Sequence, residues 1–356
     1  MLDVILKAYS IDPDSAVIQP VSNGLINKTW KVTSGGSSFI LQGINTNIFK
    51  EPLKLSENIS NIALHLKEHH PDYLFAAPLL NNANATLTWS DNSAYRLMPF
   101  IENSQTIDRV VSTGQAYEAS LQFGKFTTVL AGFDTAKLNI IIRDFHNLTL
   151  RYTQFESSIQ YAKRPRVQRA AEVITKLRAF YPLVEDFEKI TKSQLFHKRV
   201  THHDTKISNV LFNEHYKGMC VIDLDTVMPG YFISDVGDML RTYVSPATEE
   251  ETDLESITIR EPIFEAIVAG YFEYMHDQLN EFEKAHFLYS GLFLTYMQAL
   301  RFITDYLNND IYYGANHEYH NFDRACNQLT LLERMKETES RLQNIIKNSV
   351  KKNYCL

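Results

Sequence analysis

Cysteine is scarce in this chain and is not arranged for bonding. The 356 residues include only three, Cys220, Cys326 and Cys355, and none of them has the spacing of paired metal ligands. This usage argues against a disulfide framework or a zinc site and favours a reducing cytoplasm. The first ten residues contain Asp3 and lack the basic start and apolar stretch of a signal peptide. No apolar run has the length needed to span a bilayer, so we expect no membrane partner.

Positive charge is also in deficit. The chain has 35 Lys and Arg against 42 Asp and Glu, a net charge of -7. This balance disfavours a general surface for nucleic acid or anionic membranes, and the sequence gives no sign of an obligate protein partner. A site for a polyanionic small molecule would have to gather its positive charge locally.

One polar octapeptide carries the clearest chemical signal. Residues 202–209 read H-H-D-T-K-I-S-N, and Asp223 follows nineteen residues after Asp204. Protein kinases use a loop with His, any residue, Asp, and Asn five residues later, followed by a metal-binding Asp. The spacing predicts that Asp204 accepts or orients a substrate hydroxyl proton and that Asn209 and Asp223 hold Mg²⁺. Lys206 stands where kinases often direct a lysine at the γ-phosphate.

The segment that follows supports this interpretation, because the octapeptide alone can arise by chance on any polar loop. Val221, Ile222 and Leu224 give residues 220–224 the apolar run of a buried strand that ends in carboxylates. Charged groups at such a strand end are usually paired or metal-bound. Asp225 is a further candidate for a metal ligand or a contact behind one, and a turn or capping role is the alternative.

Several segments resemble a known kinase family. H-H-D-T-K-I-S-N, V-I-D-L-D-T-V-M-P-G and S-D-V-G-D-M-L-R are similar to motifs of the aminoglycoside and choline kinase-like phosphotransferases. Segments beginning at Gly24, Phe39, Tyr95 and Arg301 resemble the N-acetylhexosamine 1-kinase branch, and the resemblance runs from about Gly24 to Arg334. It implies that ATP and Mg²⁺ are used to phosphorylate the anomeric hydroxyl of N-acetylglucosamine or N-acetylgalactosamine.

Two alternatives stay open. The same scaffold can serve choline, homoserine or an aminoglycoside, although a cationic substrate would favour an acidic or aromatic cage. The chain can also be a nucleotide-binding pseudo-enzyme or a partner protein. The presence of Asp204, Asn209 and Asp223 argues against that second alternative.

The predicted elements fit an α+β, protein-kinase-like fold with two lobes, since the chain exceeds one ordinary core. Residues 1–100 predict a small, β-rich, nucleotide-binding lobe with a helix at 53–69 and strands at 16–20, 29–33, 39–42, 86–89 and 94–98. Residues 101–356 predict a larger, mainly helical lobe that holds the catalytic loop and the sugar site. Its helices are expected at 114–131, 137–146, 167–180, 262–275, 285–307 and 323–347.

The nucleotide site is expected in the first lobe. Backbone N–H groups between the first two strands can cover the ATP phosphates, and the candidates there are Asn23, Gly24, Asn27 and Thr29. An ordinary hairpin turn explains Gly24 equally well. The resemblance places the inter-lobe hinge at 95–101, where backbone atoms from Met98 to Phe100 would pair with adenine.

Gln42 departs from the protein-kinase pattern. It stands in the third strand where a lysine normally pairs with the phosphates, and a neutral amide cannot neutralise them. The N-acetylhexosamine kinase branch is similar in carrying glutamine here, so an inactive enzyme is not implied. The charge then falls to Mg²⁺ and Lys206, with Lys28 or Lys31 as weaker candidates. Glu57 on the next helix is expected to be solvated or locally paired.

Sugar recognition is inferred from the resemblance. It places Arg301 and Tyr312 at positions that contact the sugar and Asp204 at the anomeric hydroxyl. Thr242 stands where an aromatic wall is expected, and Tyr243 is a possible substitute. From the residues alone, Arg301 would be an exposed helix arginine and Tyr312 a packed tyrosine.

The S-D-V-G-D segment contains Asp235 and Asp238. The resemblance implies that Asp235 braces the catalytic loop through backbone hydrogen bonds. A helix N-cap is the simpler prediction and is compatible with that role. His146 and His203 receive no role.

Overall fold

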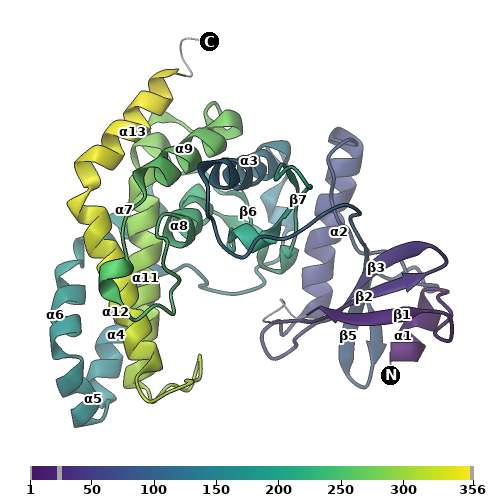
Figure 1. Cartoon of the computed structure of the whole chain (residues 1–356), viewed down its shortest axis with the longest axis horizontal. Coiled ribbons are helices and arrows are strands. Elements are labelled where there is room, and N and C mark those ends of the chain that lie inside the picture. Colours follow the sequence, from purple (N-terminus) through teal and green to yellow (C-terminus); the bar gives the residue numbers. More distant parts are fainter. Residues whose placement is uncertain (1, 22–25, 353–356) are drawn as a thin grey trace.

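The computed structural model describes residues 2–21 and 26–352 and has two lobes (Figure 1). The smaller lobe is built on a five-stranded antiparallel sheet in the order β1-β2-β3-β5-β4. Its elements are α1 Leu2–Ala8, β1 Val17–Val21, β2 Lys28–Ser34, β3 Ser37–Gly43, α2 Pro52–His69, β4 Thr88–Ser90 and β5 Ser93–Pro99. The predicted strands and the predicted helix of this lobe are confirmed, and α1 is an addition.

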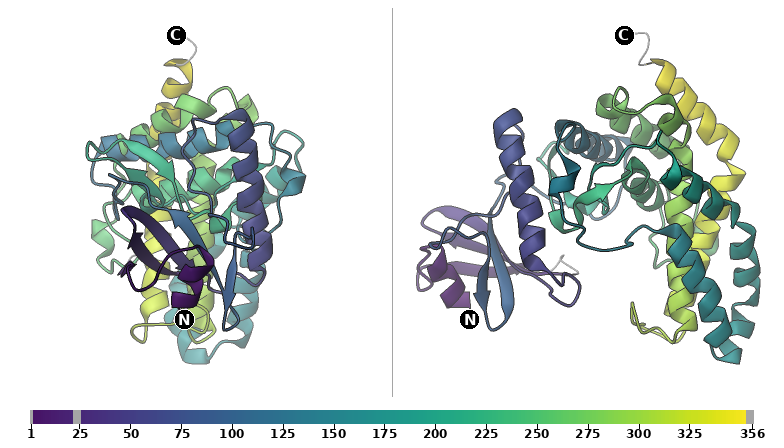
Figure 2. Two further views of the ribbon diagram at one scale, coloured as in Figure 1. Left: turned by 90° about the vertical axis from the view of Figure 1, so that its right-hand side faces the viewer. Right: turned by 180° about the vertical axis from the view of Figure 1, so that it is seen from behind.

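Helix α2 lies between the sheet and the larger lobe (Figure 2). One face of the helix is buried through Leu55, Ile59, Ile62 and Leu66. The same helix buries Asn58, whose Nδ2 donates to Asn139 O at 2.9 Å and to Val227 O at 3.1 Å. Asn139 N donates back to Asn58 Oδ1 at 2.7 Å. An uncharged amide therefore fastens α2 to the helical lobe.

The larger lobe is mainly helical, as predicted. Its helices are α3 Thr113–Val129, α4 Leu148–Tyr161, α5 Arg164–Arg169, α6 Ala171–Ala179, α7 Pro182–Lys192, α8 Phe232–Tyr243, α9 Glu261–Met275, α10 Glu281–Ala285, α11 Phe287–Leu307, α12 His320–Glu337 and α13 Glu339–Lys352. Two short antiparallel strand pairs lie at the site: β6 Arg199–Thr201 with β9 Met228–Gly230, and β7 Val210–Phe212 with β8 Gly218–Val221. Across residues 2–21 and 26–352, no helix is long and apolar enough to cross a membrane.

The helix predicted at 137–146 is wrong. Only a short 3-10 turn, η1 Thr135–Lys137, forms there, and the chain then runs irregularly until Asn147 caps α4. The backbone of Asn139 is committed to Asn58 of α2, which removes it from a helical ladder. Helices α4, α7, α8 and α10 are additions to the predicted set, and the helices predicted at 167–180 and 323–347 each divide in two.

Helices α3 and α9 cross closely because glycine stands on both sides of the contact. A Cβ on Gly270 of α9 would lie 2.3 Å from Tyr117 O, and one on Gly124 of α3 would lie 2.8 Å from Tyr271 O. Neither distance is compatible with a real Cβ. The absence of side-chain atoms at these positions thus sets the separation of the two helices.

Gly270→Ala should destabilise the protein by about 1–3 kcal/mol, because the added methyl meets backbone that cannot move aside cheaply. In a helix interior, alanine is normally more stabilising than glycine, so the expected loss of stability is opposite in sign to the effect of helix propensity. The free energy of unfolding in urea measures the change. Gly114→Ala in α3 is the control, since the nearest atom to its Cβ is 3.9 Å away. Equal effects of the two substitutions would contradict the close crossing.

Candidate active site

A buried histidine anchors the predicted catalytic loop. The loop leaves β6 at Thr201, and His202 is buried beside the ring of Phe123, at 5.3 Å between centroids. Its Nε2 lies 2.9 Å from Ile222 O, and Asp204 N donates to its Nδ1 at 3.3 Å. These contacts fix the proton on Nε2. Burial lowers the pKa of His202, so the imidazole is neutral and accepts the hydrogen bond that holds the backbone of Asp204.

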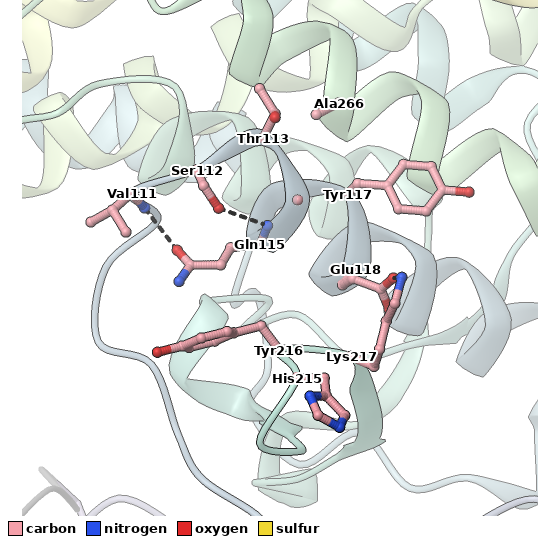
Figure 3. A pocket seen from close by; sticks show the side chains of 11 residues that line it. Val111, Ser112, Thr113, Gln115, Tyr117, Glu118, His215, Tyr216, Lys217 and Ala266 are labelled. Atoms are coloured by element: carbon pink, nitrogen blue, oxygen red, sulfur yellow. Dashed lines mark hydrogen bonds and ion pairs between the residues drawn. The ribbon is translucent and has the colours of Figure 1, made fainter.

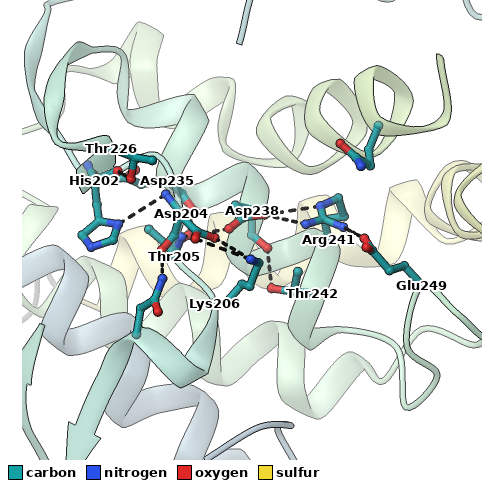
Figure 4. Close-up of polar contacts among 12 residues, drawn as sticks. His202, Asp204, Thr205, Lys206, Thr226, Asp235, Asp238, Arg241, Thr242 and Glu249 are labelled. Atoms are coloured by element: carbon teal, nitrogen blue, oxygen red, sulfur yellow. Dashed lines mark hydrogen bonds and ion pairs between the residues drawn. The ribbon is translucent and has the colours of Figure 1, made fainter. Parts of the chain in front are cut away.

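Two buried carboxylates of α8 brace the same loop (Figure 4). Asp235 accepts from His202 N at 3.0 Å and from His203 N at 2.7 Å, one bond to each oxygen. Asp238 accepts from Thr205 N at 2.8 Å. His203 has a φ of 67°, a left-handed conformation that its local sequence does not favour. The bracing predicted for Asp235 is confirmed.

Two predictions about α8 are wrong. Tyr231 precedes the helix, so Asp235 lies inside the first turn and is not the N-cap. Tyr243 is fully buried, and its hydroxyl donates to Thr205 O at 2.5 Å. Its ring therefore cannot form a wall for a sugar. The hydroxyl of Thr242 donates to a carbonyl one turn earlier in α8 at 2.6 Å, and its sugar contact stays a prediction.

The predicted catalytic carboxylate is surrounded by its predicted partners. Lys206 Nζ lies 3.1 Å from Asp204 Oδ1, and Asn209 Nδ2 donates to Asp204 O at 2.9 Å. The side chain of Asp204 keeps 20% of its surface exposed and that of Lys206 keeps 44%. Asp204 is thus held by its neighbours while remaining accessible to a substrate hydroxyl.

Asp223 is brought to this group by a turn. The predicted strand ends earlier than expected, because β8 stops at Val221 and a 3-10 helix, η3 Leu224–Thr226, follows. Ile222 N donates to Asn209 O at 2.9 Å, and Asp223 next to it has a φ of 58°. Asp223 reaches solvent, yet crowding by protein atoms and the carboxylates of Asp225 and Asp204 raise its pKa to about 7. A cation beside Asp223 would favour its ionised form.

The donor set fits Mg²⁺. Asn209 uses its amide nitrogen on the loop, which leaves its oxygen for a metal, and Asp223 adds a carboxylate. Within the described part of the chain, His, Cys, Asp and Glu form no cluster of three or more that could hold a metal. Mg²⁺ commonly takes one or two protein oxygens and completes its shell with phosphate oxygens and water. The two residues suit that arrangement better than a closed protein cage.

Asp225 is occupied by two residues of the small lobe. Its Oδ1 lies 2.5 Å from Arg96 Nη2, and its Oδ2 accepts from Asn27 Nδ2 at 2.7 Å. Both Asp225 and Arg96 are almost fully buried. The metal role of Asp225 stays a prediction, while its ion pair across the lobes is a feature that the sequence did not reveal.

Gln42 contacts the same arginine. Arg96 lies opposite it in the β3–β5 register, and Arg96 Nε and Nη2 donate to Gln42 Oε1 at 3.0 and 2.7 Å. Gln42 Nε2 donates to Thr29 Oγ1 at 3.4 Å. Glu57 is exposed, which confirms that it is solvated. It accepts from Asn139 Nδ2 at 3.1 Å, and Asn139 lies 82 positions away in the sequence, so it is not a local partner.

The other nucleotide candidates are less defined. Asn23 and Gly24 fall outside the described residues. Phe100 N donates to Ser38 O at 3.2 Å, and Lys31 Nζ lies 3.8 Å from the centre of the Phe100 ring. Met98 lies opposite Ile40 in the β3–β5 register. Adenine pairing by Met98 and Phe100 stays a prediction, although the N–H of Phe100 already has a partner.

Arg301 and Tyr312 lie together, as the resemblance implies. Arg301 Nη2 is 3.4 Å from Tyr312 Oη, and its guanidinium lies 5.3 Å from the Tyr313 ring. Asp305 of α11 accepts from Tyr312 N at 2.8 Å and from Tyr313 N at 2.9 Å, which holds the segment. Tyr312 is 73% exposed, so the alternative of a packed tyrosine is wrong.

A chain of charges joins this pair to the catalytic loop. Arg241 pairs with Asp238 at 2.9 Å and with Glu249 at 2.8 Å, and Arg324 binds the other oxygen of Glu249. The guanidinium of Arg324 lies 5.3 Å from the Tyr313 ring. Asp238 in turn holds the catalytic loop, so the two regions share one network.

His146 lies behind the loop. Its ring centroid is 5.4 Å from that of His203, and burial together with His203 lowers its pKa. Burial also lowers the pKa of His203 to about 4. Both imidazoles are therefore neutral packing groups at physiological pH.

A separate cavity of about 630 Å³ opens at the start of α3 (Figure 3). Ser112, Gln115, Glu118, Tyr216 and Lys217 are among the residues that line it. Lys217 pairs with Glu118 at 2.7 Å. The lining includes none of the predicted site residues.

Comparison with known proteins agrees with this geometry. A model described as the phosphotransferase enzyme family matches residues 17–281. The microcompartment-associated aminopropanol kinase has a similar structure, with a TM-score of 0.64 at 14% identity over 95% of this chain and 97% of the other. Choline kinase from Cryptosporidium parvum gives 0.59 at 12% over 98% and 99%. Spectinomycin phosphotransferase with ADP and spectinomycin gives 0.56 at 13% over 98% and 97%. These likenesses establish the fold.

Asp235→Asn should destabilise the protein by about 2–3 kcal/mol, because one of two buried backbone N–H groups loses its acceptor and the charge that strengthens both bonds disappears. Urea unfolding measures the change. Asp134→Asn is the control, since Asp134 caps Ala136 N at an exposed turn and should contribute less than about 1 kcal/mol. Similar losses in the two variants would count against a bracing role for Asp235.

Proposed function

Since the chain belongs to the phosphotransferase enzyme family, we propose that it transfers the γ-phosphate of ATP to the anomeric hydroxyl of an N-acetylhexosamine. The products would be the sugar 1-phosphate and ADP. The acceptors implied by the motif agreement are N-acetylglucosamine and N-acetylgalactosamine. Phosphotransfer to a small molecule follows from the family, and the identity of the sugar is the proposal.

The observation that carries the sugar assignment is the environment of Arg301. Among the described residues, no carboxylate lies within ion-pair distance of its guanidinium, which instead contacts Gln298 at 3.2 Å and Tyr312. A cation facing the substrate would repel choline or another ammonium substrate. A neutral sugar offers hydroxyl and acetyl oxygens that a guanidinium can bind, and Tyr312 adds an exposed aromatic surface.

Asp204 would act on the acceptor. Its carboxylate takes or orients the proton of the C1 hydroxyl, whose oxygen attacks the γ-phosphorus in line with the departing ADP oxygen. The P–O bond to ADP breaks as the bond to the sugar forms, and the proton goes to Asp204. Lys206, 3.1 Å from Asp204, would contact the transferred phosphoryl group.

Mg²⁺ held by Asn209 and Asp223 would neutralise charge on the phosphates when bound. The contribution of the protein is to position the residues that bind the acceptor hydroxyl and the phosphates. The hydrogen bond from Asn209 to Asp204 O makes the two functions parts of one rigid loop. Alignment of the hydroxyl and the phosphate is then set by packing that exists before either substrate arrives.

Purified protein with ATP and Mg²⁺ should release ADP with N-acetylglucosamine or N-acetylgalactosamine, and phosphorus NMR should place the phosphate on C1. A panel that also contains choline, ethanolamine, homoserine and an aminoglycoside measures the preference. Turnover with a cationic acceptor but with neither amino sugar would overturn the sugar assignment and keep the family chemistry.

Asp204→Asn serves as the control for chemistry in this panel. Its turnover should fall by about 10²–10⁴ while ATP binding persists, because only proton transfer and hydroxyl orientation are lost. A nucleotide-binding pseudo-enzyme would show no turnover in either form.

Arg301→Gln should raise the KM for the amino sugar by about 10- to 100-fold and leave the KM for ATP unchanged, because a charge-assisted hydrogen bond to the acceptor is removed. Arg178→Gln is the matched control, since Arg178 pairs with Glu156 on a helix surface. Steady-state kinetics with each substrate varied in turn measures both values. A change confined to the KM for ATP would contradict a contact between Arg301 and the sugar.

A further inference from the structure

The third strand of the small lobe lacks the phosphate-binding lysine of a kinase, but the positively charged side chain of Arg96 lies beside that position. Gln42 holds the strand position, and Arg96 of β5 lies directly opposite it. Cross-strand partners in an antiparallel sheet point to the same face, so the buried side chain of Arg96 lies on the same face of the sheet as that of Gln42, which holds the position of the lysine. Two hydrogen bonds from Arg96 to Gln42 Oε1, at 3.0 and 2.7 Å, lock this placement.

The same guanidinium reaches the magnesium segment. Arg96 Nη2 lies 2.5 Å from Asp225 Oδ1, and Asp225 stands two residues beyond Asp223. The side chain of Arg96 is 2% exposed. A buried charge needs both a counter-ion and hydrogen bonds, and Asp225 with Gln42 supplies them. The cation is therefore fixed between the sheet and the residues predicted to hold Mg²⁺.

One donor of this arginine is left over. Arg96 Nη1 is buried and has no hydrogen-bond partner among the described residues. A buried guanidinium N–H without an acceptor is costly, and a water, an ion or a ligand can supply the missing acceptor. An anionic oxygen is the acceptor that a guanidinium binds best, and nucleotide phosphates are the anions that this lobe would hold.

We propose that Arg96 is the phosphate-binding cation of the small lobe and that Gln42 and Asp225 position it. The ligand class is the phosphate chain of a nucleotide, so this inference rests on the proposed use of ATP. In protein kinases the corresponding cation and its acid come from the third strand and the following helix. Here the cation comes from β5 and the acid from the segment after Asp223.

Two other cations of the region contact partners elsewhere, and a third, Lys28, is exposed at the start of β2. Lys31 Nζ lies over the Phe100 ring at 3.8 Å, and Lys206 pairs with the catalytic Asp204. Glu57, the nearest analogue of the kinase helix acid, accepts from Asn139. This distribution explains why a neutral residue is tolerated at position 42. The side-chain carbonyl of Gln42 orients the guanidinium of Arg96, and the arginine carries the positive charge.

The test compares ADP with adenosine by titration calorimetry in the presence of EDTA, so that neither metal nor turnover contributes. Arg96→Gln should weaken ADP binding by about 10- to 100-fold and change adenosine binding by less than about twofold, because only the phosphates lose a partner. An equal loss for both ligands would mean that Arg96 only supports the fold, and no loss for ADP would overturn the inference outright.

Three further variants keep the test valid if Arg96→Gln unfolds by leaving Asp225 unpaired. Arg96→Gln combined with Asp225→Asn removes both charges of the pair, and it is compared with Asp225→Asn alone to isolate the arginine. Adding Gln42→Lys to the double variant should raise its affinity for ADP by at least about tenfold, since the lysine returns a cation to the position used in kinases. Failure of the lysine to restore ADP affinity would contradict the proposed equivalence.

Arg199→Gln is the matched control. Arg199 forms another buried ion pair, with Glu283 at 2.6 Å, in the helical lobe. Its loss should lower stability while the ratio of ADP to adenosine affinity stays that of the wild type. Wild-type protein that binds no adenine nucleotide would overturn the proposed function itself, whereas wild-type binding with an unchanged Arg96→Gln variant would overturn only the role of Arg96.

Discussion

The catalytic geometry depends on the two buried carboxylates that α8 directs at the loop beside it. Asp235 binds the N–H groups of His202 and His203, and Asp238 binds that of Thr205. A left-handed non-glycine residue costs of order 1 kcal/mol or more and persists only where its surroundings impose it. The bond from His203 N to Asp235 imposes it here, and Asp204 follows directly in the chain. The position of Asp204, the predicted catalytic carboxylate, is thus set by tertiary contacts.

The same acids extend the constraint toward the acceptor side. Asp238 pairs with Arg241, whose other partner, Glu249, also binds Arg324. Arg324 lies against the Tyr313 ring. Buried ion pairs contribute little net stability but hold their members in one arrangement. Such a chain of charges links the catalytic-loop segment to Arg301 and Tyr312, the predicted acceptor contacts, although the two come from segments about a hundred residues apart.

The sequence predicted those parts of the site whose relation is local. Asp204, Asn209 and Asp223 lie on one short β-hairpin and its entry loop, so motif spacing translates directly into proximity. Arg96 escaped prediction because its role follows from strand register across 54 residues and from an acid in the other lobe. The helix expected at 137–146 does not form for a related reason: the backbone there bonds to α2, which is distant in sequence.

Charge balance unites these features. Around the predicted phosphate path, Asp204, Asp223 and Asp225 face the cations Arg96 and Lys206. Crowding by protein atoms, and after it the carboxylates of Asp225 and Asp204, raise the pKa of Asp223 to about 7. A divalent cation beside Asp223 would favour its ionised form. The same cation would also neutralise charge on the phosphates, which the uncharged side chain of Gln42 cannot do. Under the proposed function, a chain with net charge -7 binds a polyanion with few cations at the site, because buried acids position those cations and Mg²⁺ would supply further positive charge.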